Sequence, residues 1–198
     1  MARVYVGMSG GVDSSVAAAL LVEQGHEVTG VYMKNWSEDL PGMHCPWADD
    51  VADAKRVAVG LGIDFRVFDF QRQYKQNVVD YMIREYQAGR TPNPDVMCNQ
   101  EVKFKLFLQA ALAAGAEYIA TGHYARVTHP ANSTAQSPPE DFLESSAKLL
   151  RARDDTKDQT YFLYRVTSEA LAKTLFPLGE FTKAEVRQMA TQRGLWTA

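Results

Sequence analysis

The chain has 198 residues, of which 46% are hydrophobic and 23% are charged. This length and composition are those of a globular protein with one substantial core, and they argue against a disordered chain. Its formal net charge of -3 also argues against non-specific binding to nucleic acid by the chain as a whole.

Two further features predict where the protein works. Residues 1–3 do not resemble the start of a signal peptide, and the apolar run 16–22 is far shorter than the ~20 residues of a membrane-spanning helix. We therefore expect a soluble, cytoplasmic protein without a membrane partner. Its two cysteines, Cys45 and Cys98, make no disulfide framework, and we expect both to be reduced thiols.

Charge is divided unevenly along the chain. Residues 1–70 hold 5 basic and 10 acidic side chains, whereas residues 71–198 hold 16 basic and 14 acidic ones. A polyanion larger than a nucleotide is therefore expected to meet the second part of the chain. Chance scatter of solvated charges is the alternative.

The first seventy residues predict a repeated unit of strand, loop and helix. Apolar runs typical of buried strands occupy residues 3–7, 27–33 and 65–70. Between them, apolar side chains at helical spacing occur in residues 16–21 and 51–61. Gly25 and Gly62 are suited to end these two helices.

The middle of the chain continues the alternation. Two further helices are expected over residues 78–86 and 102–110, each followed by a glycine that ends it. A loop, residues 90–99, joins them. The strand-like residues 118–121 follow the second helix.

The C-terminal third is less regular. Residues 128–146 are polar and rich in Pro and Ser, which predicts a flexible insertion, and we assign it no chemistry. A strand at 149–152 and a short helix at 159–166 are expected next. Thr182 and Glu185 make a capping box for the last helix. Because no element follows to pack back on that helix, we expect an N-terminal fragment of a longer protein.

This order of elements predicts an α/β fold with a doubly wound, mainly parallel sheet. In such sheets ligands bind beyond the carboxyl ends of the strands, so the loops at Ser9, Lys34 and Gly122 should converge on one crevice. We expect this domain to span residues 1–175. A second, mostly helical domain is expected to begin within 176–198.

The segment SGGVDSS, residues 9–15, lies between the first strand and the first helix. Its glycine pair lets backbone N–H groups turn toward an anion, and the helix N-terminus adds partial positive charge. It lacks both the lysine of a Walker loop and the spacing of a dinucleotide fingerprint. An ordinary Gly/Ser turn is the alternative. Asp13 is an unusual neighbour for phosphate, so we assign it either Mg²⁺ binding or the holding of the loop.

The segment TPNPDVMCN, residues 91–99, is stiffened by two prolines. It delivers Cys98 to the start of a helix that Asn99 is expected to cap. With Lys103 and Lys105 nearby, Cys98 is a candidate for a lowered pKa and a reactive thiolate. A small buried hydrophobic side chain is the alternative.

These motifs resemble known families. SGGVDSS after a first strand resembles the PP-loop of the ATP pyrophosphatase superfamily, which cleaves ATP between the α- and β-phosphates and adenylates a substrate oxygen. GRTPNPDVMCNQEVKF, residues 89–104, is similar to the signature of the tRNA-specific 2-thiouridylases, the wobble-uridine sulfurtransferases. The same family is matched, in order, by GMSGGVDSS, MKNW at 33–36, ATGHYAR at 120–126 and KDQTYFLY at 157–164. The likeness covers nearly the whole chain apart from the insertion.

The resemblance implies a role for each matching position. The ATP contacts would be Gly7, Met8, Ser9, Gly10, Gly11, Val12, Asp13, Ser14, Met33 and Gly122. The contacts to the target base would be Asn93, Pro94 and Asp95, and the other tRNA contacts would be His123, Lys157, Asp158 and Gln159. Asp95 would assist proton transfer. Residues 1–175 would be the PP-loop catalytic domain, and 176–198 would begin a central tRNA-binding domain.

The implied reaction uses ATP and Mg²⁺ to adenylate the C2 oxygen of uridine 34 in tRNA, after which sulfur replaces it. Cys98 would be the nucleophile that attacks a persulfide on a second cysteine, charged by a cysteine desulfurase or a relay protein. In the family that second cysteine lies just beyond a segment resembling GLWTA, where this sequence ends. Cys45 has no recognised acceptor role, so we interpret it as structural. His44 and Cys45 are two ligands without partners, so we assign no metal site.

Several alternatives stay open at this point. Another PP-loop enzyme, such as a lysidine synthetase or an amidotransferase-coupled ligase, would need no catalytic thiol, and a plain adenine-nucleotide-binding module would need no catalysis. Lys34 is a candidate for charge stabilisation at the transferring phosphate. Trp36 and Trp47 are candidates for stacking, with core packing as the alternative. A basic cluster is expected to add tRNA affinity, with a solvated face as the alternative: Lys148, Arg151, Arg153, Lys157 and Arg165.

Overall fold

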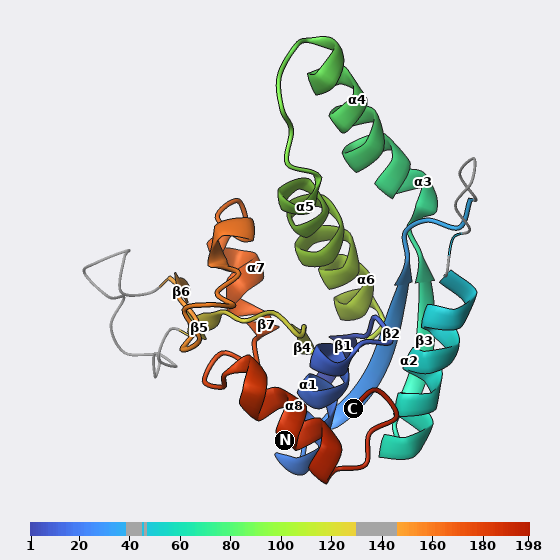
Figure 1. Ribbon diagram of the computed structural model, residues 1–198, viewed down its shortest axis with the longest axis vertical. Helices are drawn as coiled ribbons and strands as arrows, with labels where there is room; N and C mark the ends of the chain where they lie inside the picture. Colours follow the sequence, from blue (N-terminus) through green and yellow to red (C-terminus); the bar gives the residue numbers. More distant parts are fainter. Residues whose placement is uncertain (39–44, 46, 130–145) are drawn as a thin grey trace.

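The computed structural model describes residues 1–38, 45, 47–129 and 146–198, and at its centre is a parallel five-stranded sheet (Figure 1). The strand order is β3-β2-β1-β4-β7. The strands are β1 (Arg3–Gly7), β2 (Glu27–Lys34), β3 (Asp64–Asp69), β4 (Tyr118–Ala120) and β7 (Thr174–Leu175). This confirms the expected α/β fold. The sequence missed β7, since two residues are too few to give a pattern.

The chain reverses its direction across the sheet between β1 and β4. It builds outward from β1 to β2 and β3, and then returns to place β4 on the other side of β1. Neighbouring loops therefore diverge at the carboxyl ends of β1 and β4, which opens a crevice there. The topology alone selects this point as the place for a ligand.

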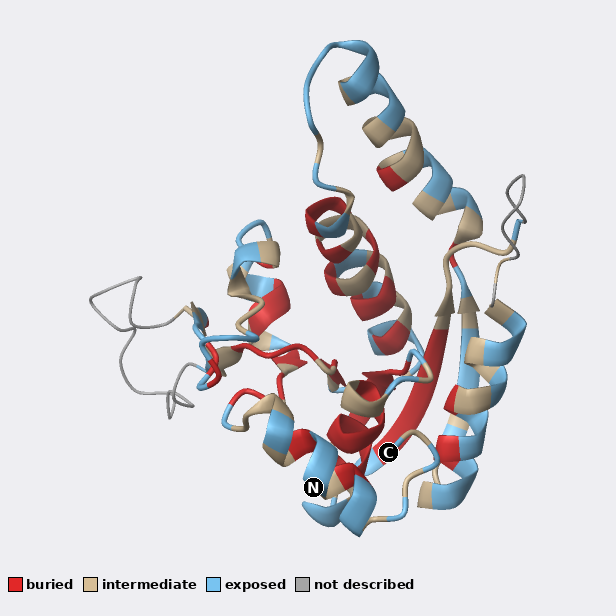
Figure 2. Cartoon of the chain, viewed as in Figure 1, coloured by how far each residue is buried: buried red, intermediate tan, exposed pale blue. Residues whose placement is uncertain are grey.

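Alternating side chains of the sheet enter two separate core layers. On β1, Val4 and Val6 pack with α1 (Val12–Glu23) and α2 (Trp47–Leu61), whereas Tyr5 faces the opposite layer. This is the two-residue period of a strand, with helices covering both faces. Figure 2 shows the buried residues concentrated in the central strands and in α1.

Two long helices with π-helical middle portions form the second layer. The first combines α3 (Gln71–Tyr74), η1 (Lys75–Val79) and α4 (Asp80–Gln87), and the second combines α5 (Pro94–Met97), η2 (Cys98–Phe107) and α6 (Leu108–Ala113). In Figure 1 the first rises away from the sheet, and the chain turns back to enter the second. Phe107 of the second helix is fully buried and belongs to the same core layer as Tyr5.

The start of this second helix corrects two sequence expectations. The loop predicted for 90–99 ends early, because Pro94 takes a first-turn position where its missing N–H is not needed. Asn93 is the cap, and its Oδ1 accepts hydrogen bonds from the backbone N–H groups of Asp95 (3.1 Å) and Val96 (3.2 Å). The predicted capping role of Asn99 is wrong. Asn99 lies inside the helix, 3% exposed, and its amide donates to the Phe162 carbonyl at 3.3 Å.

The predicted insertion at 128–146 lies outside the described residues except at its two ends. Those ends adjoin an antiparallel pair of strands, β5 (Arg126–Thr128) and β6 (Lys148–Leu150). The 3-10 helix η3 (Thr160–Phe162) and the unpredicted helix α7 (Ser168–Ala172) then lead to β7. Among the described residues, none of the helices has the length and apolar character needed to cross a membrane.

The last helix, α8 (Lys183–Gln192), packs against α1. Its Val186 and Ala190 share one core cluster with Val16 and Leu20 of α1. The predicted capping box is present, since Thr182 and Glu185 exchange backbone and side-chain hydrogen bonds. A domain boundary near residue 175 stays a prediction, and this contact joins the segments on its two sides.

The cap of α8 can be tested by Thr182→Ala. Loss of the bond to the Glu185 N–H should lower the free energy of unfolding by about 1 kcal/mol. Thr191→Ala on the same helix is the matched control, because the Thr191 hydroxyl caps no orphan N–H and donates only to the Arg187 carbonyl. Its effect should stay below about 0.5 kcal/mol in urea unfolding followed by circular dichroism. Equal losses would contradict the cap assignment.

Candidate functional site

A cavity of about 320 Å³ opens at the carboxyl ends of β1, β2 and β4. Its walls are Gly7, Met8, Ser9, Asp13, Ser14, Tyr32, Met33, Asn35, Asp50, Lys103, Thr121, Gly122, His123 and Gln159. The predicted convergence of three loops is confirmed, although Lys34 itself does not line the cavity. Of the predicted ATP contacts, Gly10, Gly11 and Val12 belong to the same turn but are not among the wall residues.

The turn after β1 leaves a helix end available to an anion. Gly10 has a φ of +77°, and a Cβ there would lie 2.7 Å from the Asp50 carbonyl oxygen, so only glycine fits. Gly11 precedes α1 without any side-chain cap. The hydroxyls of Ser14 and Ser15 instead donate back to the Gly11 carbonyl, at 3.1 and 2.8 Å. Among the residues that the structure describes, the first-turn N–H groups of α1 therefore have no side-chain acceptor, which is the arrangement that binds phosphate.

Gly122 brings the loop after β4 against this turn. A Cβ on Gly122 would lie 2.8 Å from the backbone nitrogen of Ser14 and 2.9 Å from the carbonyl carbon of Asp13. The two loops thus pack backbone to backbone. Glycine is required here by close approach, which the sequence motif did not reveal.

Asp13 is held by two partners from distant segments. Its Oδ1 accepts hydrogen bonds from the Tyr124 hydroxyl at 3.0 Å and from Lys183 Nζ at 2.6 Å. Burial and the adjacent Asp13 charge raise the pKa of Tyr124, so the phenol stays protonated and donates. Of the two roles expected for Asp13, these contacts are those of holding the loop. Sequence reasoning missed both partners, and Lys183 is 170 residues away along the chain.

His123 lies at the base of the cavity. It is 8% exposed, its ring is surrounded by Phe104 and Phe176, and its Nδ1 is 2.8 Å from the Thr121 hydroxyl. Burial, with the nearby charge of Lys103, lowers the pKa of His123 to about 3. The imidazole is therefore neutral at physiological pH. Its predicted contact with tRNA stays a prediction, and any partner must reach it through the cavity.

The segment Lys157–Gln159 is anchored mainly by its second and third residues. Asp158 accepts hydrogen bonds from the Ala152 N–H (2.8 Å) and the Thr160 hydroxyl (2.7 Å). Burial by itself would raise the pKa of Asp158, but these hydrogen bonds lower it overall. Gln159 accepts from the Tyr124 N–H at 2.9 Å and lines the cavity. The tRNA contacts expected of this segment are untested, and Lys157 is its exposed residue.

Cys98 is half-buried and lies in the long helix that begins at Pro94. Asp95 precedes it in the sequence, and Lys103 follows it. Burial raises the pKa of the Cys98 thiol, Lys103 opposes this, and Asp95 adds to it. The expected lowered pKa is therefore wrong for this state. Because the helix begins at Pro94, Cys98 is in its second turn and lies beyond the N-terminal charge.

Lys103 is part of the cavity wall, and its charge also acts on the Cys98 thiol. It is half-buried, it lines the cavity, and it influences the pKa values of both Cys98 and His123. Asn93, which caps the helix, and Asp95, in its first turn, are exposed and do not line the cavity.

The other candidate residues make contacts outside the cavity wall. Lys34 Nζ lies 3.9 Å from the centre of the Trp47 ring, and the Trp36 indole donates to the Glu38 carbonyl at 2.8 Å. The Cys45 thiol is 3.9 Å from the Trp36 carbonyl oxygen. His44 lies outside the described residues. Within the described part of the chain, no group of three or more His, Cys, Asp or Glu side chains is placed to hold a metal ion.

The expected basic cluster is partly neutralised. Arg151 forms ion pairs with Asp155 and Asp158, and Arg153 pairs with Glu185. These pairs reduce the field that the two arginines present to a polyanion. The contribution of the cluster to tRNA affinity stays a prediction.

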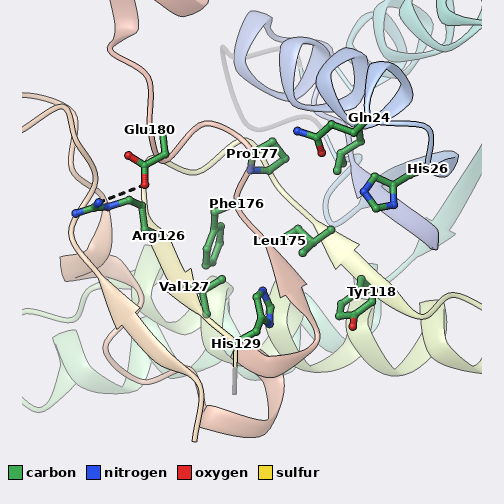
Figure 3. A pocket seen from close by; sticks show the side chains of 11 residues that line it. Gln24, His26, Tyr118, Arg126, Val127, His129, Leu175, Phe176, Pro177 and Glu180 are labelled. Carbon is green, nitrogen blue, oxygen red and sulfur yellow. Dashed lines mark hydrogen bonds and ion pairs between the residues drawn. The ribbon is translucent and has the colours of Figure 1, made fainter. Parts of the chain in front are cut away.

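A larger cavity, about 450 Å³, lies beside the C-terminal end of α1 and is shown in Figure 3. Val127, Leu175 and Phe176 make it largely apolar, and an ion pair between Arg126 and Glu180 (3.2 Å) closes one side. It shares no wall residue with the smaller cavity beside residues 9–15, the turn that we call the phosphate loop. Ser9, His123 and Lys103 therefore belong to the smaller cavity, whereas Cys98 is a wall residue of neither cavity.

The fold and the turn before α1, whose helix end carries no side-chain cap, define an α/β domain of the PP-loop type. Residues 2–198 match the family model described as tRNA methyl transferase HUP domain, and the chain belongs to this family. It is 52% identical over 200 residues to the tRNA-specific 2-thiouridylase MnmA of Christiangramia forsetii, covering 100% of this chain and 48% of that protein. It is 50% identical to the enzyme of the same name from Bacillus mycoides, covering 99% and 49%. The chain thus spans about half the length of the curated relatives it matches.

Solved structures share the fold at low sequence identity. A 4-thiouridine synthetase solved with RNA and bound ATP has a TM-score of 0.62 at 16% identity, over 98% of this chain and 41% of that one. An NMN synthetase from Francisella tularensis has a TM-score of 0.53 at 16% identity, over 97% and 61%. These likenesses confirm the expected α/β fold.

The close approach at Gly122 predicts opposite effects for one chemical change at two positions. Gly122→Ala should destabilise the fold by about 1–3 kcal/mol, since the added methyl group meets backbone atoms that have no free space to move into. Gly60→Ala, inside α2 where an added Cβ would meet open space among the described residues, should stabilise by about 0.5–1 kcal/mol. Urea unfolding measures both. A neutral Gly122→Ala would show that the two loops do not pack as described.

The environment of Cys98 predicts its rate of alkylation as a function of pH. Iodoacetamide reacts with the thiolate, so labelling should be slow at pH 7 and should rise only above the range in which an ordinary cysteine ionises. Lys103→Met should shift the profile to higher pH, and Asp95→Asn should shift it lower. Peptide mass spectrometry follows the Cys98 peptide separately from that of Cys45. Shifts of the same sign in both variants would refute the electrostatic assignment.

Proposed function

We propose that this chain is the ATP-binding and sulfur-releasing part of a tRNA-uridine 2-sulfurtransferase. The observation that carries the proposal is the composition of one crevice. It contains the turn before α1, the phosphate loop, whose helix end has no side-chain cap, and it also contains Lys103. The charge of Lys103 acts on Cys98 as well. A nucleotide and a thiol are the two reactants that a thiolation enzyme must bring together. The 50–52% identity to the named 2-thiouridylases supports the same assignment.

ATP fits the crevice through its phosphates. The first-turn N–H groups of α1, together with Ser9 and Ser14, would hold the phosphate oxygens, while Met33 and Gly122 would contact the nucleoside. Mg²⁺ needs only one or two carboxylates in addition to phosphate and water oxygens. Asp50 is a suitable ligand, because it lines the cavity, whereas the Asp13 carboxylate is engaged by Tyr124 and Lys183. Burial, with Asp49 and Asp53 nearby, raises the pKa of Asp50, and a bound cation would offset that.

The first chemical step would adenylate the target uridine. Its C2 oxygen attacks the α-phosphorus of ATP, a new O–P bond forms, and pyrophosphate leaves. The base would be splayed from the anticodon and held near Asn93, Pro94 and Asp95, a usual mode of RNA recognition. His123, Lys157, Asp158 and Gln159 would contribute the remaining tRNA contacts. These contacts would place the tRNA over the loop that precedes Cys98.

The second step would release sulfur. The thiolate of Cys98 attacks the inner sulfur of a persulfide on a second cysteine, which forms a disulfide and frees hydrosulfide. Hydrosulfide then adds to C2 of the adenylated uridine and AMP leaves. Because burial raises the pKa of Cys98, its proton must be removed at this stage, and Asp95, whose charge acts on the thiol, is the candidate base. The second cysteine, its donor protein and a cytoplasmic site of action remain part of this proposal.

The proposal predicts a separation of partial activities in the 198-residue chain. It should bind ATP, and with tRNA it should release pyrophosphate, but it should form no 2-thiouridine, because its other cysteine, Cys45, has no assigned persulfide role. Calorimetry, a pyrophosphate assay and nucleoside mass spectrometry measure the three steps. Formation of 2-thiouridine by this chain alone would refute the need for a further cysteine. ATP binding without pyrophosphate release would favour a nucleotide-binding module.

The thiol role is tested in a chimera that joins this chain to the remaining half of the 52% identical relative. Cys98→Ser should abolish thiolation and leave ATP affinity unchanged, whereas the matched Cys45→Ser should keep both. Full thiolation by the Cys98→Ser chimera would refute the nucleophilic role proposed for Cys98.

A further inference from the structure

Lys183 reaches the phosphate loop from the opposite end of the chain. It is the first residue of α8, and its ammonium lies 2.6 Å from Oδ1 of Asp13, a wall residue of the ATP cavity. The two side chains are only 22% and 33% exposed, so solvent screens this ion pair incompletely.

The position of Lys183 is fixed by the elements around it. Its backbone N–H donates to Asp154 Oδ2 at 2.8 Å, and Asp154 Oδ1 in turn accepts from the Thr156 N–H and hydroxyl. The capping box of Thr182 and Glu185 fixes the start of α8 immediately beside it. These hydrogen bonds therefore fix the backbone of Lys183 at a position from which its ammonium reaches Asp13.

A carboxylate in a phosphate site needs such a partner. Asp13 lies in the first turn of α1, where its negative charge would repel the incoming phosphates and cancel part of the attraction of the helix end. The second partner of Asp13, Tyr124, is a neutral phenol that orients the carboxylate without balancing its charge. Among the described residues, Lys183 is the only cation in an ion pair with Asp13.

We propose that Lys183 is a positioning residue that neutralises Asp13 and thereby lets the phosphate loop accept ATP. This inference rests on the proposed function, because it assumes that the loop binds the nucleotide phosphates. It also makes α8, which lies beyond the predicted domain boundary, a working part of the ATP site.

The structure supplies a matched control for the docking of α8. Arg193 just after the same helix forms a bidentate ion pair with Glu23 of α1, with both N–O distances at 2.7 Å. Glu23 is the last residue of α1, and neither Arg193 nor Glu23 lines the ATP cavity. Arg193→Met therefore removes an interhelical ion pair without touching the phosphate loop.

The test is a double-mutant cycle on the 198-residue chain, with Mg²⁺-ATP affinity measured by calorimetry. Lys183→Met should raise the Kd for ATP about tenfold, because it leaves the Asp13 charge unbalanced beside the phosphates. In an Asp13→Asn background the same substitution should change the Kd by less than about twofold. Lys183→Arg should retain most of the affinity, and Arg193→Met should bind like the unsubstituted chain. Thermal unfolding of each variant checks that the fold is retained.

Two results would overturn the inference. If Lys183→Met binds ATP like the unsubstituted chain, Lys183 only fastens α8. If Lys183→Met weakens binding equally in the unsubstituted chain and in the Asp13→Asn background, Lys183 acts on the nucleotide independently of the carboxylate. Failure of the unsubstituted chain itself to bind ATP would instead contradict the proposed function, and is recognised before any variant is compared.

Discussion

The architecture of the site depends on a backbone-to-backbone contact between the loop after β4 and the first turn of α1. Gly122 lies so close to Asp13 and Ser14 that no side chain fits between them. This contact is formed where the chain order of the sheet reverses, with β1 and β4 as neighbours. It keeps the uncapped end of α1 beside Thr121 and His123, so that one cavity is walled by both loops. Without that approach the helix end would face open solvent.

Electrostatics divides the site into a part for anions and a part kept neutral. The turn after Gly11 offers backbone N–H groups, and Lys103 adds a cation to the cavity wall. Burial keeps the imidazole of His123, another wall residue, uncharged, and it keeps the thiol of Cys98, which is not a wall residue, protonated in this state. Under the proposed function, such a site would receive a nucleotide before sulfur is released, because the thiol becomes a nucleophile only when its proton is removed.

The C-terminal helix gives the loop both support and charge balance. The apolar face of α8 packs on α1, while Arg193 and Lys183 make ion pairs with the last and second residues of α1. An aspartate without a cationic partner in an anion-binding turn would weaken binding of the anion, because like charges repel. Contact with an element from the end of the chain resolves this conflict, and it couples the docking of α8 to the phosphate loop.

Much of this protein was determined by the sequence itself. Apolar periodicity and glycine stops located four of the five strands and the long helices, because these signals are local, and the SGGVDSS sequence located the turn before α1 for the same reason. The tertiary structure decided the rest. The ionisation of Cys98 depends on burial, which local sequence does not report, and the helix start at Asn93 depended on a proline that resembled a loop signal. The partners of Asp13 were decided by folding alone, since Tyr124 and Lys183 approach it only when the sheet and α8 are assembled.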